Sequence, residues 1–310
     1  MFVHDRAFSR YPFARFRRTG WGACQNLSMA HIVVPEAEAL LDQEIKVLDK
    51  GFVRLVDYLG GDQRIVQAAR VSYGAGTKSY RQDRGLILYL MKHEHTSPFE
   101  QVQLTFHAKM PIFVARQWVR HRTARINEIS GRYSVMKDEF YLPEPDMIRY
   151  QSDVNKQARS ESALPPEEAE TVIAQMQADQ QQVFAHYQEM LERGVAREIA
   201  RANLPLSLYT EWYWQIDLHN LFHFLALRLD AHAQYEIRVY AEAMARCAKA
   251  VAPLAYEAFE EHVLGGVRLS RSECQALMAV ERGEEPSLTG LDLVEFQQKL
   301  RKIREANHGG

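Results

Sequence analysis

Hydrophobic and polar residues alternate along the segment QVQLTFHAKM, residues 101–110. The apolar positions fall on one side of an extended chain and the polar positions on the other, which predicts a half-buried strand of an antiparallel sheet. The aromatic-rich segment SLYTEWYWQI, residues 207–216, predicts a second strand. Residues 51–61 predict a short strand that leads into a helix.

Hydrophobic residues recur at helical spacing in other segments, which predicts helices there. The expected helices are residues 84–94, a helix opened by Pro111, a long helix from Pro165–Pro166 to Gly194, residues 218–229 and residues 291–306. On the helix after Pro111, we expect Gln117, Arg120 and His121 to project together, because residues three and four apart share a helix face.

Three regions are expected along the chain. They are an N-terminal extension (residues 1–45), one continuous catalytic domain (46–262) and a helical C-terminal tail (263–310). The first 28 residues hold five arginines and one acid, as an organelle transit peptide would. We favour a flexible leader, or a start at Met29. In the tail, Ser270 and Glu273 predict a capping box, and we expect the tail to pack on the body or on a partner subunit.

The composition narrows the class of protein. With 46% apolar and 25% charged residues, the chain is an ordinary globular protein. Its formal net charge of −2 argues against a nucleic-acid partner, and no apolar run reaches the roughly 20 residues of a membrane helix. Cys24, Cys247 and Cys274 lie far apart without a CxxC motif, which favours the reducing cytoplasm over a disulfide framework.

Positive charge is concentrated in one short segment. The cations are Arg116, Arg120, His121, Arg122, Arg125 and Arg132, and the single acid is Glu128. A salt-bridged surface would need interleaved acids, so this excess predicts a site for a small anion. Ser130 and Gly131 add a hydroxyl group and a backbone that an anion can approach closely.

The spacing of this segment resembles a family signature. Arg120–His121–Arg122, seven residues and Ser130 resemble the RHR-x7-S motif of flavin-dependent thymidylate synthases. Three other segments are similar to that family in the same order, namely KHEHTSPFEQ (92–101), REIARANLPLSLYT (197–210) and LRLDAHAQYEIR (227–238). The resemblance therefore covers residues 46–262.

The resemblance implies a fold and an activity. The implied fold is α+β, with an antiparallel sheet flanked by helices and a long helical segment. The implied assembly is a homotetramer whose active sites are shared between subunits. The implied reaction is the reductive methylation of dUMP to dTMP, with methylene-tetrahydrofolate as carbon donor and NADPH as reductant through FAD.

Matched positions imply the site residues. Those implied for dUMP are Gln117, Arg120, Glu128, Ser130, Gly131, Arg132, Arg201 and Arg228. Those implied for FAD are Ser97, Arg120, His121, Arg122, Glu128, Asp217, His219 and His223. The implied catalytic group is Arg228, which would lie against the uracil, with Ser130 and His95. Ser130 lacks an obvious adjacent base, so we interpret it as a contact to phosphate or uracil rather than a nucleophile.

The sequence departs from the family at some of these positions. Arg125 stands where the family commonly has Ser. At positions 217, 219 and 223 some members carry Asn, Arg and Asn instead of the Asp, His and His found here. These differences bear on the flavin contacts more than on the activity.

Two other functions stay open at this point. His219 and His223 are four residues apart and His232 follows, so a metal-dependent hydrolase is one alternative, although the segment lacks the Glu of HExxH. A non-catalytic nucleotide-binding protein is the other. Cys247 lies among alanines and is expected in the core. A mechanism that attacks uracil with a cysteine, as in the unrelated classical thymidylate synthases, is therefore disfavoured.

Overall fold

The computed structural model describes residues 32–71, 80–152 and 158–306. The expected leader, with the candidate start Met29, lies outside the described residues. The last part of the expected extension belongs to the body of the fold: helix α1 (Pro35–Glu38) buries Ala37 completely, and strand β1 (Glu44–Val47) joins the sheet. The folded body therefore begins before residue 46.

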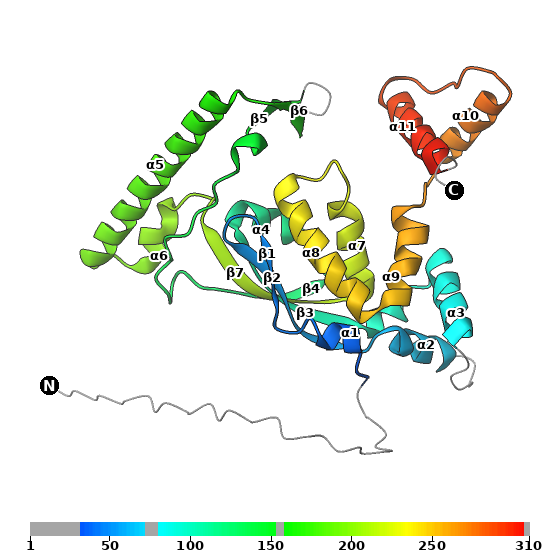
Figure 1. Ribbon diagram of the computed structural model, residues 1–310, viewed down its shortest axis with the longest axis horizontal. Coiled ribbons are helices and arrows are strands. Elements are labelled where there is room, and N and C mark those ends of the chain that lie inside the picture. The colour runs from blue at the N-terminus through cyan, green and yellow to red at the C-terminus, as the bar shows by residue number, and fades with distance from the viewer. Residues whose placement is uncertain (1–31, 72–79, 153–157, 307–310) are drawn as a thin grey trace, which may run out of the picture. The chain divides into compact units, whose positions relative to one another are not determined.

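A five-stranded antiparallel sheet forms the centre of the fold (Figure 1). Its strand order is β1-β2-β3-β7-β4, with β2 at Gly51–Leu59, β3 at Gln103–Pro111, β7 at Tyr209–Asp217 and β4 at Ala124–Glu128. Strands β5 (Arg149–Gln151) and β6 (Arg159–Ala163) form a separate two-stranded sheet. The predicted strands at 101–110 and 207–216 are confirmed, and they are paired with each other as β3 and β7.

Three helices cover one face of this sheet, namely α4 (Ile112–Trp118), α7 (Leu218–Arg228) and α8 (Tyr235–Val251). The alternating apolar residues of β3 are buried, as their pattern predicts. The fully buried Trp118 of α4 contacts Trp212 and Trp214 of β7 edge-on, with ring centroids 5.2 and 5.3 Å apart. The prediction of an α+β fold with an antiparallel sheet flanked by helices is confirmed.

The other face of the sheet carries a half-buried polar network. Arg54 donates to Nδ1 of His107 at 2.6 Å, so the His107 proton is on Nε2, which donates to Glu211 at 2.6 Å. The ring of Tyr213 stacks on His107 with centroids 4.7 Å apart. These hydrogen bonds satisfy most of the polar atoms of the network, which would otherwise be costly to remove from water, while Nε of Arg54 is buried without a partner among the described residues.

The segment after Pro111 differs from the expectation. Pro111 is the last residue of β3 and the N-cap of α4, and α4 already ends at Trp118. Arg120 and His121 lie in the turn beyond this helix, so the prediction that they share a helix face with Gln117 is wrong. The physical reason is topological, because the chain must turn here to bring β4 alongside β7.

The long helix is confirmed as α5 (Pro166–Glu192), followed by Gly194 in the left-handed conformation with φ +78°. Proline fits the first turn of a helix and glycine the position after its end. A second, smaller core packs beneath α5, and its buried residues are Phe140, Phe184, Tyr187, Ala200 and Leu208. The short elements η2 (Pro145–Met147), α6 (Arg197–Ala200) and η3 (Arg201–Asn203) surround this part of the fold.

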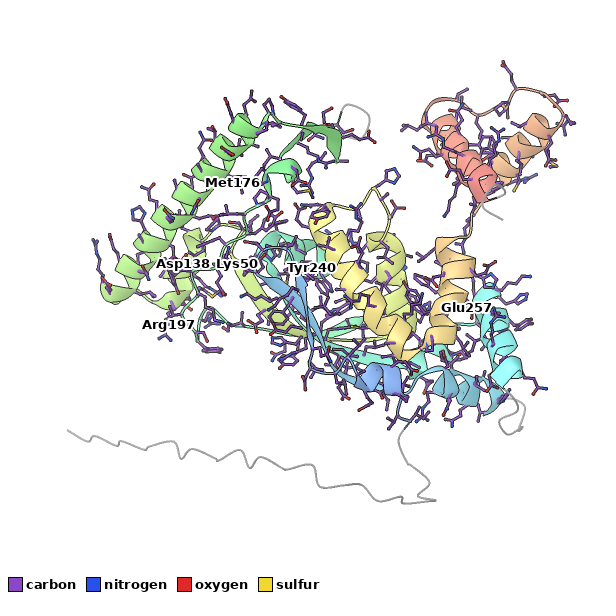
Figure 2. The ribbon with its side chains drawn as sticks, in the orientation of Figure 1. Lys50, Asp138, Met176, Arg197, Tyr240 and Glu257 are labelled. Carbon is purple, nitrogen blue, oxygen red and sulfur yellow. The ribbon has the colours of Figure 1, made fainter. Side chains whose placement is uncertain are left out.

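Helices α2 (Asp62–Val71), α3 (Tyr80–Lys92) and α9 (Pro253–Phe259) pack together at another side of the body. The predicted helix at 84–94 is confirmed as part of α3. Arg84 of α3 donates to both carboxylate oxygens of Glu257, which Figure 2 labels beside α3. The short 3-10 turn η1 (Phe99–Gln101) then leads into β3.

Asp62 supports the start of α9, and its titration gives a testable prediction. Its carboxylate accepts backbone hydrogen bonds from Leu254 (2.8 Å) and Ala255 (2.9 Å). Burial raises the pKa of Asp62 from 3.8 to about 6, although both hydrogen bonds act in the opposite direction. Between these values the native state binds more protons than the unfolded chain, so the contribution of this group to the free energy of unfolding falls as pH rises.

We therefore expect Asp62→Asn to remove about 2–3 kcal/mol of pH dependence between pH 4 and 6. Urea unfolding on both sides of this window measures it. Asp292→Asn, on an exposed position of the C-terminal tail, is the control and leaves the dependence unchanged. The same pH dependence in the Asp62→Asn variant and the wild type contradicts the prediction.

The C-terminal tail consists of α10 (Arg271–Glu281) and α11 (Gly290–Ala306), which follow the single π-helical turn η4 (Glu260–Leu264). The capping box of Ser270 and Glu273 is confirmed. Lys299 of α11 donates to Glu273 at 2.7 Å, and Phe296 is completely buried. Within the described residues, no helix combines the length and the apolar character that a membrane crossing requires.

Candidate active site

The arginines of the sequence cluster lie before, on and after β4, which is one of the two edge strands of the five-stranded sheet. The five exposed side chains are those of Arg116, Arg120, Arg122, Arg125 and Arg132. Among the residues that the structure describes, Arg132 alone of these five forms an ion pair, with Glu198 at 3.4 Å. Because guanidinium groups stay charged at working pH, the cluster favours an anionic ligand.

The loop after β4 brings a second group of arginines to the same place. Ser130 accepts a hydrogen bond from the backbone N–H of Arg132 at 3.3 Å, and Arg197 donates to the carbonyl oxygen of Tyr133 at 2.8 Å. Gly131 is buried against Arg201, because a Cβ atom here would lie 3.0 Å from Cδ and 3.3 Å from Nη1 of that arginine. Residues 70 positions apart in the sequence therefore form one cationic loop, which we define as Ser130–Arg132 with Arg197 and Arg201.

The contact between Gly131 and Arg201 gives a testable prediction. In Gly131→Ala, the new methyl group would press on the Arg201 side chain and lie 2.9 Å from the sulfur of Met136. We expect affinity for dUMP, the ligand that the family resemblance implies, to fall about threefold to tenfold, the cost of displacing a charged contact at a half-exposed site. Gly85→Ala is the matched control, because no atom of the described residues lies within 4 Å of its added Cβ. Calorimetric titration with dUMP measures both variants, and equal affinities in all three proteins contradict the prediction.

Arg228 is held at the end of α7 by helix α4 and the turn that follows it. Its Nε donates to Nε2 of His121 at 3.2 Å, and its Nη2 donates to the carbonyl oxygen of Gln117 at 3.3 Å. The Gln117 side chain is fixed in turn by a hydrogen bond to Gln234. Two expected dUMP residues and one expected FAD residue are thereby brought together.

His121 is an uncharged acceptor in this arrangement. Burial lowers its pKa to about 4, and the nearby charges of Arg228 and His223 add to that effect. Arginine has no acceptor, so the hydrogen bond requires a lone pair on Nε2 and places the His121 proton on Nδ1. Arg228 therefore keeps its full positive charge for a ligand, without a carboxylate partner among the residues described.

Two carboxylates that are expected to contact ligands also accept hydrogen bonds from residues of this chain. Glu128, at the end of β4, accepts a hydrogen bond from Thr210 Oγ1 at 2.5 Å. Asp217 is the N-cap of α7 and accepts from the backbone and side-chain N–H groups of Asn220, at 2.9 and 2.7 Å. The two carboxylates are thereby fixed in position, and Asp217 also stabilises the start of the helix that carries His219, His223 and Arg228.

A cavity of about 720 Å³ lies beside α7. We call it the histidine cavity, because His95, His219, His223 and His262 line it. Phe99, Phe222 and Phe259 give it aromatic walls, and its charged lining residues are Lys92, Glu94 and Arg268. The expected residues His95, His219 and His223 thus come together although 124 positions separate His95 from His219 in the sequence.

The histidine cavity and the cationic loop are separate surfaces of one chain. None of the five exposed cluster arginines lines the cavity, and neither does the expected flavin residue Ser97, which is exposed in the adjoining turn. The link between the two surfaces is His121, whose ring centroid lies 5.9 Å from that of His223. Within a single chain, the expected site residues therefore lie on two surfaces that come together near His121.

The residues present fit a flavin dinucleotide. Such a cofactor carries aromatic rings and a diphosphate, and it needs apolar ring surfaces together with cations. The histidine cavity supplies three phenylalanine side chains and several imidazoles. The exposed Arg120 and Arg122 supply charge that no acid among the described residues neutralises.

The described residues give little support to a metal-dependent hydrolase or to a cysteine nucleophile. Within the described parts of the chain, no three His, Cys, Asp or Glu side chains gather as a metal site would require, and His232 is hydrogen-bonded to Asp230 at 2.8 Å. Cys247 is completely buried, and burial raises the pKa of its thiol to about 12. A thiol that stays protonated is a poor nucleophile, which agrees with the core position expected for Cys247.

Sequence reasoning missed several residues of these surfaces. Arg197 stands four positions before Arg201 in the segment REIAR, which is a signal that could have paired them. His262 and Arg268 line the histidine cavity, but they belong to a region of polar composition with no local motif. Only the packing of α9 and the tail linker beside α7 reveals their position.

Two family models match the chain. The model described as "Thymidylate synthase complementing protein" matches residues 54–254, and the model described as "Thymidylate synthase ThyX C-terminal domain" matches residues 267–306. The first covers β3, β4 and β7, most of β2, and helices α3, α4 and α7, and the second covers α10 and α11.

Relatives and solved structures agree with these matches. The chain is 57% identical over 265 residues to the flavin-dependent thymidylate synthase of Treponema denticola, across 86% of this chain and 100% of that protein. It is 56% identical over 278 residues to that of Treponema pallidum, across 90% and 91%. The crystal structure of a UMP/dUMP methylase from Streptomyces cacaoi, bound with 5-Br dUMP, is similar with a TM-score of 0.64 at 34% identity, across 71% of this chain and 98% of that chain. The chain belongs to the flavin-dependent thymidylate synthase family.

Proposed function

We propose that this protein catalyses the reductive methylation of dUMP to dTMP, with FAD as cofactor, methylene-tetrahydrofolate as carbon donor and NADPH as reductant. Family membership supports the reaction class. The structural observation that carries the proposal is the position of Arg228. Its guanidinium group donates hydrogen bonds to a neutral histidine and to a carbonyl oxygen, so no acid neutralises its charge among the described residues. A pyrimidine ring can be activated there without a cysteine.

The cationic loop would hold the phosphate of dUMP. Arg132 and Arg201 can each present a planar pair of donors to phosphate oxygens, and Gly131 allows the backbone to approach closely. Ser130 adds a hydroxyl donor. We assign Gln117, Arg120 and Glu128 to the remaining contacts with dUMP, which would orient the base.

Arg228 would act on the base itself. For C5 to attack the one-carbon unit the uracil ring must be electron-rich, and a guanidinium group beside the ring would stabilise the negative charge of an enolate-like form of the ring that precedes this attack. His121 and Gln117 position the group before the substrate arrives, so little reorganisation is needed during the reaction. Removal of a proton from the substrate needs a further side chain. We assign His95, which lines the histidine cavity, to this step.

The histidine cavity and the arginines of the signature segment would hold FAD. The residues assigned to it are Ser97, Arg120, His121, Arg122, Glu128, Asp217, His219 and His223. When bound, the flavin supplies the hydride chemistry that side chains cannot perform. The protein's part is to orient the cofactor and to neutralise its phosphates.

We propose that the protein is a homotetramer with shared active sites and that it works in the cytoplasm. The edge strand β4 exposes Ile126, and among the described residues no strand pairs with one side of its backbone. A neighbouring subunit that covers this edge could bring its own histidine cavity to the arginines. The free thiols Cys247 and Cys274 agree with a reducing compartment.

The absorbance spectrum of the purified protein tests the proposal. A flavin spectrum that is bleached by NADPH, and dTMP formation once dUMP and the folate are added, support it. Bound zinc without flavin would indicate the metal-dependent hydrolase. Tight dUMP binding without NADPH oxidation would indicate a nucleotide-binding protein without catalysis.

A further inference from the structure

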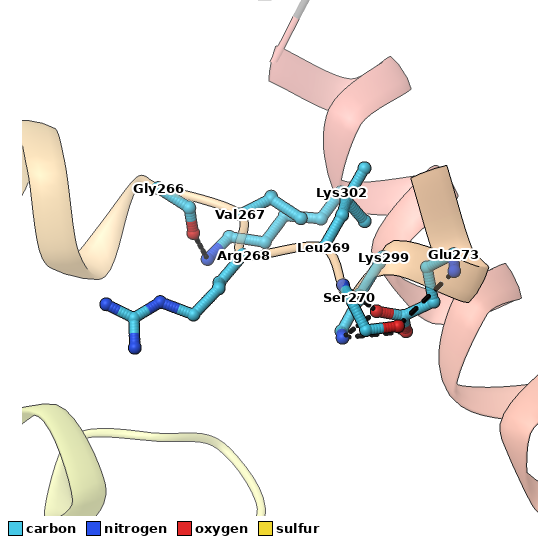
Figure 3. A pocket seen from close by; sticks show the side chains of 8 residues that line it. All are labelled: Gly266, Val267, Arg268, Leu269, Ser270, Glu273, Lys299 and Lys302. Atoms are coloured by element: carbon cyan, nitrogen blue, oxygen red, sulfur yellow. Dashed lines mark hydrogen bonds and ion pairs between the residues drawn. The ribbon is translucent and has the colours of Figure 1, made fainter. Parts of the chain in front are cut away.

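The linker between the body and the C-terminal helices is held from both sides. From the tail, Lys302 of α11 donates to the carbonyl oxygens of Leu264 (2.7 Å) and Gly266 (3.2 Å), as Figure 3 shows for Gly266. From the body, Glu94 forms an ion pair with Arg268. Gly266 itself leaves no room for a side chain, because an added Cβ would lie 2.5 Å from the carbonyl oxygen of His262. The path of the linker is therefore fixed.

This fixed linker forms part of the wall of the histidine cavity. Gly266, Val267 and Arg268 line the cavity together with residues of α3, α7 and α9. Residues 266–268 also border a second hollow of about 510 Å³ within the tail, where Lys299 is paired with Glu273. Figure 3 shows the Arg268 side chain directed away from that pair, so its charge is not used inside the tail.

In the part of the chain that the structure describes, Arg268 has one acidic partner, Glu94, which also lines the cavity. The lining holds two cations, Lys92 and Arg268, against the single carboxylate of Glu94. The pair of Arg268 and Glu94 is exposed, with 87% and 70% of the side-chain surfaces accessible. Exposed ion pairs are weak, so an anionic ligand group can replace the carboxylate at low cost.

We propose that Arg268 is a ligand-binding residue of the histidine cavity, where its guanidinium group exchanges Glu94 for an anionic group of the bound ligand. That group is a phosphate or a carboxylate on a ring-bearing molecule. The aromatic walls Phe99, Phe222 and Phe259 receive the rings, while Arg268 and Lys92 receive the charge at the edge of the cavity. The C-terminal tail thereby contributes directly to ligand binding. This inference rests on the proposed function, because that function supplies the three candidate ligands FAD, NADPH and methylene-tetrahydrofolate.

Calorimetric titration of the full-length protein tests the proposal with FAD, NADP+ and methylene-tetrahydrofolate separately. We expect Arg268→Ala to weaken binding of at least one ligand about threefold to tenfold, as for loss of a charged contact at an exposed site. The ligand affected identifies the source of the anionic group. Arg282→Ala is the matched control, since Arg282 is also an exposed tail arginine in a surface ion pair, with Glu284, and it does not line the cavity.

Glu94→Gln separates ligand binding from a purely structural tether. If Arg268 binds the ligand, removal of the competing carboxylate leaves the affinity unchanged or increases it. If the ion pair only ties the linker to the body, Glu94→Gln and Arg268→Ala weaken binding alike, and the proposal is wrong. Unchanged affinity of Arg268→Ala for all three ligands also overturns it. A wild-type protein that binds none of the ligands and forms no dTMP instead rejects the proposed function.

Discussion

Arg228→Ala is expected to lower the turnover of dUMP about 10²–10³-fold, the effect of removing a donor that stabilises transition-state charge. The side chain is partly buried at the end of α7, and it donates hydrogen bonds to two uncharged acceptors, His121 Nε2 and the carbonyl oxygen of Gln117. Its charge is therefore available to the ring. Because this charge matters most when the ring becomes negative, we expect kcat to fall more than dUMP affinity.

Single-turnover formation of dTMP measures this effect. Arg228→Lys retains the charge but loses the planar donor pair, so it should recover only part of the rate. Arg246→Ala, on an exposed position of α8, is the control and leaves the rate unchanged. An Arg228→Ala protein that turns over at the wild-type rate refutes the assigned role.

Arg201→Ala is expected to weaken dUMP binding about tenfold to 100-fold, the loss of a charge-assisted bidentate contact. The reason is its position against Gly131 in the cationic loop, where phosphate oxygens would meet two guanidinium groups. The contact is made equally in the ground state and the transition state, so kcat should change little.

Equilibrium titration with dUMP measures the loss, and the flavin content is measured on the same samples. Arg193→Ala is the matched control, because Arg193 is a nearby exposed arginine paired with Glu189 on α5. Arg201→Ala with unchanged dUMP affinity and lost flavin would show that Arg201 holds the cofactor rather than the substrate.

The strands that could be predicted from the sequence are those with one buried face. The alternation at 101–110 predicts a strand with one apolar and one polar face. In β3 the apolar face is buried under the helices and the polar face belongs to the network of Arg54 and His107. Strand β4 gave no such signal. It lies at the edge of the sheet, four of its five residues are exposed, and its short sequence ARINE holds only two apolar residues.

The candidate site was predictable in residue type but not in arrangement. The excess of arginine over acid in residues 116–132 indicated an anion site, and the structure leaves most of these arginines unpaired among the described residues. The contact of Gly131 with Arg201 and the cavity wall formed by Gly266–Arg268 depend on packing between distant segments. No local pattern encodes such contacts. The early end of α4 was missed for the same reason, because the pairing of β4 with β7 decides it.

The most direct test of this account is the product formed from dUMP and a methylene-tetrahydrofolate labelled at the transferred carbon, with NADPH as reductant. The account predicts labelled dTMP only when flavin is bound, and an unchanged intact mass of the protein throughout the reaction. A flavin-loaded protein that forms no dTMP, or one that becomes covalently joined to dUMP, contradicts it.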